Sequence, residues 1–72
     1  MTPAHCRAAR ALLGWSQNDL ASKAGVSRST VADFERDLRI PMRTMTDAMM
    51  RAFREGGIAQ VAADFAKSFD PE

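Results

Sequence analysis

Residues 16–36 read SQNDLASKAGVSRSTVADFER, and this stretch decides the fold of the chain. Its spacing predicts two short helices that meet at a steep angle through a tight turn. Such a corner needs a small residue where the helices cross and a glycine in the turn, and Ala21 and Gly25 supply them. Val26, just past the turn, and Val31, inside the second helix, are apolar residues that pin the corner.

Capping residues mark the ends of both helices in this stretch. Ser16 and Asp19 have the spacing of a capping box, and Gly25 is expected to end the first helix in a left-handed conformation. Ser27 is expected to cap the second helix, which runs to about Arg36. The predicted inward-facing residues are Leu20, Ala21, Ala24, Val31 and Phe34.

The sequence before and after this stretch is also helical in pattern. Thr2, followed by Pro3, predicts the start of an N-terminal helix that ends at Gly14. After the central stretch, residues 37–43 are expected to form a loop, because Pro41 prevents helix continuation from either side.

Two further amphipathic segments complete the chain. A helix capped by Thr44, with Asp47 three residues on, is expected to end at Gly56 and Gly57. Residues 58–69 predict a last helix that ends near Asp70 and Pro71, although such segments can also leave a domain as a strand or a tail. The predicted fold class is all-α, with four or five short helices in one domain over residues 1–72.

Composition excludes several functions. The single cysteine, Cys6, and the single histidine, His5, offer neither an internal disulfide nor a metal site. No nucleophile–base pair, carboxylate pair with a pocket or phosphate-binding glycine loop suggests an enzyme, and no cofactor is expected. No apolar run approaches transmembrane length and no signal peptide is evident, so we expect a cytoplasmic protein.

The charge distribution gives weak support for a nucleic-acid partner. The formal net charge is only +1, but residues 1–40 hold six Arg and Lys against four acids, whereas residues 41–72 hold four against five. The basic excess therefore lies in the half of the chain that contains the paired helices.

A wider set of residues resembles the Cro/cI-type helix-turn-helix family, also called the XRE family. The matching positions are Gln17, Leu20-Ala21, Ala24-Gly25-Val26-Ser27, Thr30-Val31 and Phe34-Glu35, with Ala9 to Ser16 before them and Pro41, Thr44-Met45, Ala52-Phe53 and Gly57-Ile58 after them. The resemblance covers residues 6–58 and implies a lambda-repressor-like domain with a double-stranded DNA operator as its partner. Asp37 departs from the family, which usually has glycine there, and this puts the shape of the following loop in doubt.

The resemblance also implies roles for individual residues. Gln17 would hydrogen-bond a phosphate, and Ser27, Arg28 and Ser29 would meet base edges and backbone at the start of the recognition helix. Asp33, one turn later, would face the groove or its wall. Arg10 and Glu35 would form a structural ion pair.

Residue chemistry agrees with these roles. Arg28 offers a bidentate fork that suits guanine, Thr30 offers a methyl group to thymine, and Asp33 can accept only from cytosine or act by exclusion. The arginines that can bind backbone phosphate from the following loop are Arg36, Arg39 and Arg43. Each of these residues has a plainer interpretation as a solvated surface side chain, and Ser27 is first of all a helix cap.

Two alternatives stay open at this stage. The apolar face of residues 58–69 is either part of the core or a dimer surface, with Ile58, Val61, Phe65 and Phe69 as its candidates. The function expected is sequence-specific transcriptional regulation by a homodimer on an inverted repeat. The rival is a protein-interaction module, such as an antitoxin or anti-activator, which would tend to show apolar residues on the exposed face of the recognition helix.

Overall fold

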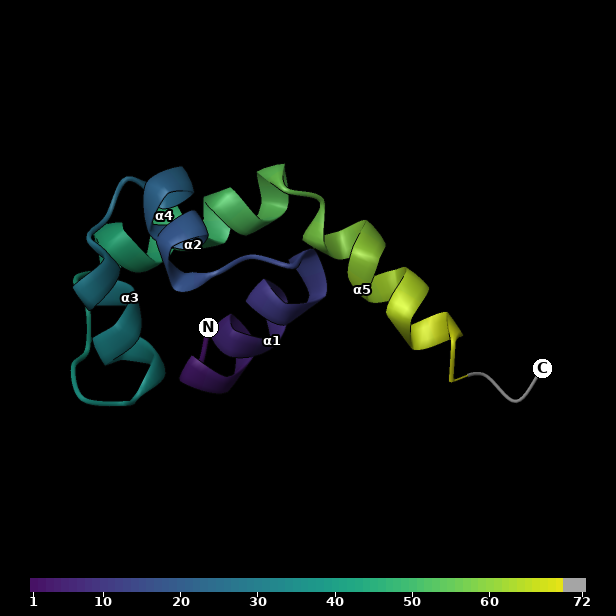
Figure 1. Cartoon of the computed structure of the whole chain (residues 1–72), viewed down its shortest axis with the longest axis horizontal. Coiled ribbons are helices and arrows are strands. Elements are labelled where there is room, and N and C mark those ends of the chain that lie inside the picture. Colours follow the sequence, from purple (N-terminus) through teal and green to yellow (C-terminus); the bar gives the residue numbers. More distant parts are fainter. Residues whose placement is uncertain (70–72) are drawn as a thin grey trace.

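The computed structural model describes residues 1–69, and all its regular elements are helices. They are α1 (Pro3–Leu13), α2 (Gln17–Ala24), α3 (Arg28–Glu35), α4 (Arg43–Glu55) and α5 (Ile58–Lys67). The all-α prediction is confirmed, and the last segment is a helix rather than a strand (Figure 1). This helix stops at Lys67, and the end expected near Asp70 and Pro71 lies outside the described residues.

The predicted caps of the first three helices are confirmed. The Thr2 hydroxyl accepts the His5 amide at 3.1 Å, and Ser16 and Asp19 form the reciprocal capping box at the start of α2. Gly25 ends α2 with φ of 72°, a left-handed conformation that glycine adopts without steric cost. The sequence therefore defines α1, α2 and the turn into α3 through local chemistry alone.

The predicted start of α4 is wrong. Helix α4 begins at Arg43, with Met42 as its N-cap and no side-chain cap, rather than after a cap at Thr44. Met42 is extended behind the buried Pro41, and its carbonyl oxygen accepts the amides of Met45 and Thr46. Because the helical hydrogen bonds already start at Met42, Thr44 lies inside the first turn.

The core lies where α2 packs against α3 and α4, while α1 covers α3 and the start of α5. Leu20, Val31, Met49 and Cys6 are fully buried there. Trp15, in the turn between α1 and α2, stacks on Phe53 of α4 with ring centroids 5.7 Å apart. These contacts support the crossing of α2 and α3 from the side of α4.

Helix α5 extends the molecule to 41 Å along its longest axis. Its first half, with half-buried Ile58, Val61 and Ala62, lies beside α1, whereas its second half projects beyond the other helices (Figure 1). None of its residues is buried, and Phe65 and Phe69 are exposed. No helix within residues 1–69 has both the length and the apolar character that a membrane crossing requires.

Candidate nucleic-acid interface

The N-terminus of α3 is built around the hydroxyl of Ser27. Its oxygen accepts the Thr30 amide at 3.1 Å and lies 2.8 Å from the Thr30 hydroxyl and 3.2 Å from the Ser29 hydroxyl. This confirms Ser27 as the helix cap. Arg28 and Ser29 follow it directly, and both side chains are exposed to solvent.

Thr30 differs from its expected role. Its side chain is buried, and its hydroxyl lies against the capping Ser27 rather than on the outer face of α3. The position one residue after Ser29 turns toward the core because a helix rotates by about 100° per residue. A thymine contact by Thr30 is therefore not supported, and the hydroxyl helps to fix the start of α3 instead.

The other end of α3 is held by the buried carboxylate of Glu35. The Arg10 guanidinium donates to both of its oxygens, Nε to Oε2 at 2.7 Å and Nη2 to Oε1 at 2.8 Å. Gln17 Nε2 donates to Oε1 at 3.1 Å, and the Cys6 thiol donates to Oε2 at 3.2 Å. The ion pair that the family resemblance implied is thus present, within a cluster that joins α1, α2 and α3.

The cluster controls the ionisation of its members. Burial alone would raise the pKa of Glu35, but the hydrogen bonds from Arg10, Gln17 and Cys6 outweigh burial, so the pKa falls below its usual value. Burial, assisted by the hydrogen bond to Glu35, raises the pKa of the Cys6 thiol to about 12. Glu35 is therefore a stable anion, and Cys6 a stable neutral donor.

Two contacts of the cluster were not predicted from the sequence. Cys6 was considered only for a disulfide or a metal site, whereas its buried thiol donates a hydrogen bond to Glu35. Arg7 was given no role, yet its guanidinium donates to the Glu35 backbone oxygen at the end of α3. The only sequence signal for this was spacing, since positions 7 and 10 share one face of α1.

Gln17 lies at the first position of α2 and is half-buried. One hydrogen of its amide nitrogen is directed to Glu35. The amide nitrogen of a glutamine carries two hydrogens, so a second donor remains. The geometry therefore ties Gln17 to the end of α3 without using up its donor capacity.

The arginines after α3 are all exposed, but they differ in their partners. Arg39 Nε lies 3.9 Å from Asp33 Oδ2, and Arg43 Nε lies 3.8 Å from Asp47 Oδ2 at the start of α4. The Arg43–Asp47 pair is solvent-exposed and the Arg39–Asp33 pair is partly so, and ion pairs of this kind have small energetic value. Within residues 1–69, neither Arg28 nor Arg36 forms an ion pair, so both cations face solvent uncompensated.

Asp37 begins the loop after α3 with φ of 61°, a left-handed conformation. Aspartate adopts this conformation more readily than most residues other than glycine. The backbone therefore makes the turn that a glycine favours, and the departure from the family at this position does not prevent it. The amides of Asp37 and Leu38 return hydrogen bonds to Phe34 and Asp33.

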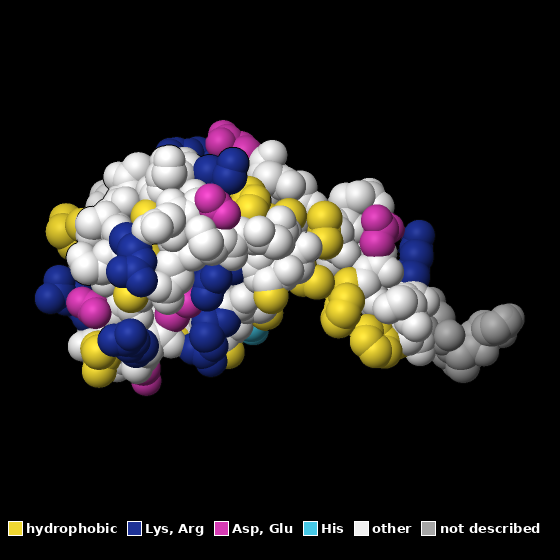
Figure 2. Space-filling view, in the orientation of Figure 1, with side chains coloured by type: hydrophobic (Ala, Val, Ile, Leu, Met, Phe, Trp, Pro, Cys, Tyr) yellow, Lys and Arg dark blue, Asp and Glu magenta, His cyan; other side chains and the backbone are white. Residues whose placement is uncertain are grey.

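The candidate residues fall in two separate regions. The start of α3 and the loop after it lie at one end of the molecule, with Gln17 joined to α3 through Glu35. The apolar candidates of α5 lie toward the opposite end (Figure 1). Basic side chains are spread over the part formed by α1–α4, among several acids, rather than forming one unbroken patch (Figure 2).

Helices α2 and α3 cross at a tight glycine turn and pack their inner faces into the core. The outer face of α3 is polar, exposed and flanked by cations. This arrangement defines a DNA-binding helix-turn-helix domain. The family model described as Helix-turn-helix matches residues 7–56. The chain belongs to this family, and it is a Cro/cI-type DNA-binding regulator with the lambda-repressor-like fold. The family is one of regulators rather than enzymes. No curated protein matches the chain.

Proposed function

We propose that the chain binds a specific operator through the outer face of α3, with Arg28 as the residue that reads a base. The observation that carries this proposal is the free guanidinium of Arg28 in the first turn of a helix fixed at both ends. A bidentate arginine fork pairs best with the O6 and N7 atoms of guanine in the major groove. Ser29 lies beside Arg28 and supplies a hydroxyl donor to the adjacent backbone.

Backbone phosphates set the position of α3 in the groove. The second amide hydrogen of Gln17 and the N-terminal amides of α2 suit one phosphate, while Ser27 suits another at the start of α3. Arg36 supplies an uncompensated cation after α3. Arg39 and Arg43 can exchange their exposed carboxylate partners for phosphate, because such pairs are weak.

Asp33 limits which sequences are accepted. Its carboxylate lies one turn after Ser29 and is partly exposed beside Arg39. A carboxylate near the groove repels phosphate and accepts a hydrogen bond from cytosine, but it gives nothing to guanine or thymine acceptors. We assign Asp33 to discrimination between operators rather than to affinity.

The complete DNA-bound unit is a homodimer on an inverted repeat. One recognition helix reads only a half-site, and a second copy doubles the contacts at a spacing of about 34 Å, one turn of DNA. A net charge of +1 supplies little general attraction to DNA, so affinity depends on such well-placed contacts.

The test is the replacement Arg28→Ala, measured by fluorescence anisotropy on an operator selected from random duplexes. Loss of one bidentate base contact should weaken binding by about 1–3 kcal/mol per half-site and relax the preference at one base pair. Arg51→Ala is the matched control, because Arg51 is an exposed arginine of α4. Equal affinities for wild type and Arg28→Ala would contradict the assignment.

A second candidate function is binding of a protein partner. The observation that favours it is the loop after α3, where Leu38, Ile40 and Met42 expose 68%, 94% and 66% of their surface. Three exposed apolar side chains beside a polar helix are unusual for a free surface. If this function dominates, the triple replacement Leu38→Ser, Ile40→Ser and Met42→Ser abolishes regulation in a reporter strain, whereas Arg28→Ala preserves it.

A further inference from the structure

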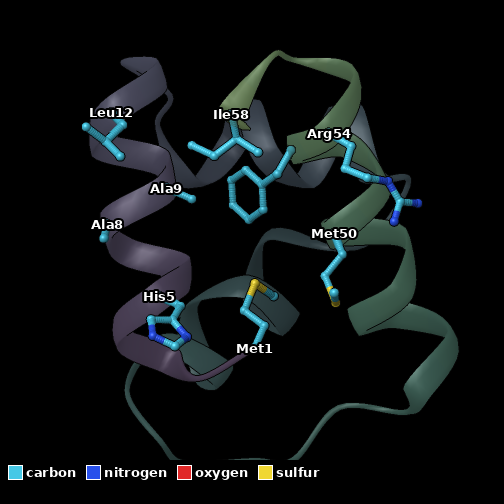
Figure 3. A pocket seen from close by; sticks show the side chains of 9 residues that line it. Met1, His5, Ala8, Ala9, Leu12, Met50, Arg54 and Ile58 are labelled. Atoms are coloured by element: carbon cyan, nitrogen blue, oxygen red, sulfur yellow. The ribbon is translucent and has the colours of Figure 1, made fainter. Parts of the chain in front are cut away.

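An open apolar groove lies on the side of the molecule formed by α1, α4 and the start of α5. It encloses about 380 Å³, and Figure 3 shows the side chains that line it. Ala8 and Leu12 come from α1, Met50 from α4 and Ile58 from α5, while Phe53 is buried beneath them. No residue of α2 or α3 lines the groove, so it is separate from the proposed DNA-binding face.

The size of the groove suits a small molecule. An apolar cavity of about 150 Å³ accommodates benzene, which has six carbon atoms, so the volume of this groove holds about 15 non-hydrogen atoms. One turn of an α-helix, with about 3.6 residues, has roughly twice as many atoms and does not fit. Ligand pockets in proteins begin at about 300 Å³ and are lined mainly by apolar side chains, as this groove is.

The shape of the groove suits an extended chain. Its lining runs from Leu12 and Ile58 at one end to Met1 and His5 at the other (Figure 3). From His5 to Leu12 the axis of α1 rises by about 10 Å. An alkyl chain with C–C bonds of about 1.5 Å advances about 1.25 Å per bond, so about eight to ten carbon atoms span this length.

The charge at the rim of the groove suits an anionic head group. Arg54 of α4 is the only Arg, Lys, Asp or Glu in the lining, so no acidic side chain opposes an anion there. Its guanidinium extends toward solvent on the side away from α1 (Figure 3), and within residues 1–69 it forms no ion pair. A carboxylate at the rim would meet this cation and stay partly hydrated, which avoids the large cost of burying a charge.

We propose that the groove binds a single-chain carboxylate of about eight to twelve carbon atoms, with its alkyl chain along α1 over Phe53 and its carboxylate beside Arg54. The volume and length of the groove set the size of the chain, and the lone cation sets the head group. Met50 adds a flexible side chain that adapts to an alkyl ligand. The proposal adds a ligand site to the DNA-binding domain.

The test is titration calorimetry of the full chain with decanoate, below the concentration at which decanoate forms micelles. We expect one saturable site with a dissociation constant of about 0.1–1 mM. Hexanoate, with four fewer methylene groups, should bind about tenfold more weakly or worse. Tetradecanoate should gain no more than about threefold over dodecanoate, because its additional methylenes leave the groove, whereas two buried methylenes would give about 15-fold.

Ala8→Glu tests the location of the site. Ala8 is exposed, so the fold tolerates the change, but the new carboxylate enters the apolar wall of the groove and repels the ligand. Ala11→Glu is the matched control, since Ala11 is also exposed on α1 but does not line the groove. Ala8→Glu should weaken decanoate binding about tenfold or more, and Ala11→Glu less than twofold.

Arg54→Gln tests the head group. It should weaken decanoate binding about two- to fivefold, as expected for an exposed ion pair, and leave the binding of the uncharged decanol unchanged. Arg51→Gln is the control, because Arg51 is an exposed arginine of α4 outside the groove. Equal effects of Arg54→Gln on the two ligands would overturn the carboxylate assignment.

Three results would overturn the site itself. They are the absence of saturable decanoate binding, an affinity that rises with every added methylene beyond twelve carbons, and equal effects of Ala8→Glu and Ala11→Glu. Arg28→Ala should bind decanoate like wild type, because α3 does not line the groove. A chain that reads its operator through Arg28 but binds no decanoate would therefore refute the ligand site and leave the base-reading assignment intact.

Discussion

At the scale of single residues, Glu35 determines how α3 is held. Its carboxylate is buried, and within the described residues its two oxygens accept hydrogen bonds from Arg10, Gln17 and Cys6. A buried carboxylate is costly unless it is paired and fully hydrogen-bonded, and both conditions are met here. The same carboxylate changes the chemistry of Cys6, which is a hydrogen-bond donor rather than a reactive thiol.

Cys6 should resist alkylation in the folded protein. The thiolate is the reactive form, and a pKa of about 12 leaves almost none of it at pH 8. The thiol is also fully buried. Iodoacetamide labelling followed by mass spectrometry should therefore proceed only after urea unfolding. An introduced cysteine, Ala11→Cys, is the exposed control on the same helix and should react at once. Prompt labelling of Cys6 in folded protein would contradict this prediction.

At this scale, the sequence predicts the helix caps correctly but not the positions of Thr30 and Thr44. Ser16, Ser27 and Gly25 act within three or four residues of themselves, so their roles follow from local spacing. Thr30 was given a thymine contact, but it is buried, and its burial depends on how α3 rotates against the core. Thr44 was misplaced because the preceding extended Met42 had already started α4.

At the scale of elements, the crossing of α2 and α3 is supported by the turn before α2 and the end of α4. Trp15 stacks on Phe53, and Lys23 of α2 lies 5.1 Å from the centre of the indole ring. Gly56, just after α4, lies directly against that ring. The sequence predicted Gly56 as a helix breaker, but its close approach to Trp15 depends on tertiary packing and has no local signal.

Gly56→Ala should destabilise the fold by overpacking. A β-carbon at this position would lie 2.6 Å from the Trp15 ring, although the backbone conformation suits any residue. We expect a loss of about 1–3 kcal/mol in urea unfolding. Trp15→Phe removes the ring atoms that clash, so the same glycine replacement should cost much less in that background. Equal costs in both backgrounds would show that the loss has another origin.

At the scale of the whole molecule, α1 and α4 join two regions that are held in place to different degrees. The end that contains α3 is fixed by the Glu35 cluster, while α5 at the other end has no buried residue. The family resemblance, stated over residues 6–58, is confirmed by the family model, which matches residues 7–56. The arrangement of residues 58–69 stayed open, since an apolar face alone does not distinguish a core contact from an intermolecular one.

The stability of the whole fold should fall in acid because of Glu35. Its pKa is lowered in the folded state, so the unfolded chain binds a proton first as pH falls below about 4.5. The contribution is complete above that value and is lost as pH drops through the lower folded pKa. Glu35→Gln should reduce stability at pH 7 and flatten the acid decline in urea titrations. An unchanged acid decline would mean that other groups cause it.

The residues that fix α3 in the fold differ from those on its outer face, and this difference has an evolutionary consequence. Ser27 fixes one end of the helix and Glu35 the other, while Arg28 contributes no ion pair to the described structure and Asp33 only an exposed one. Under the roles proposed for Arg28 and Asp33, gene duplication followed by exchange of these two side chains would generate regulators with new targets without a penalty in folding. Several regulators built on this fold, natural or engineered, could then work in one cell without binding one another's targets.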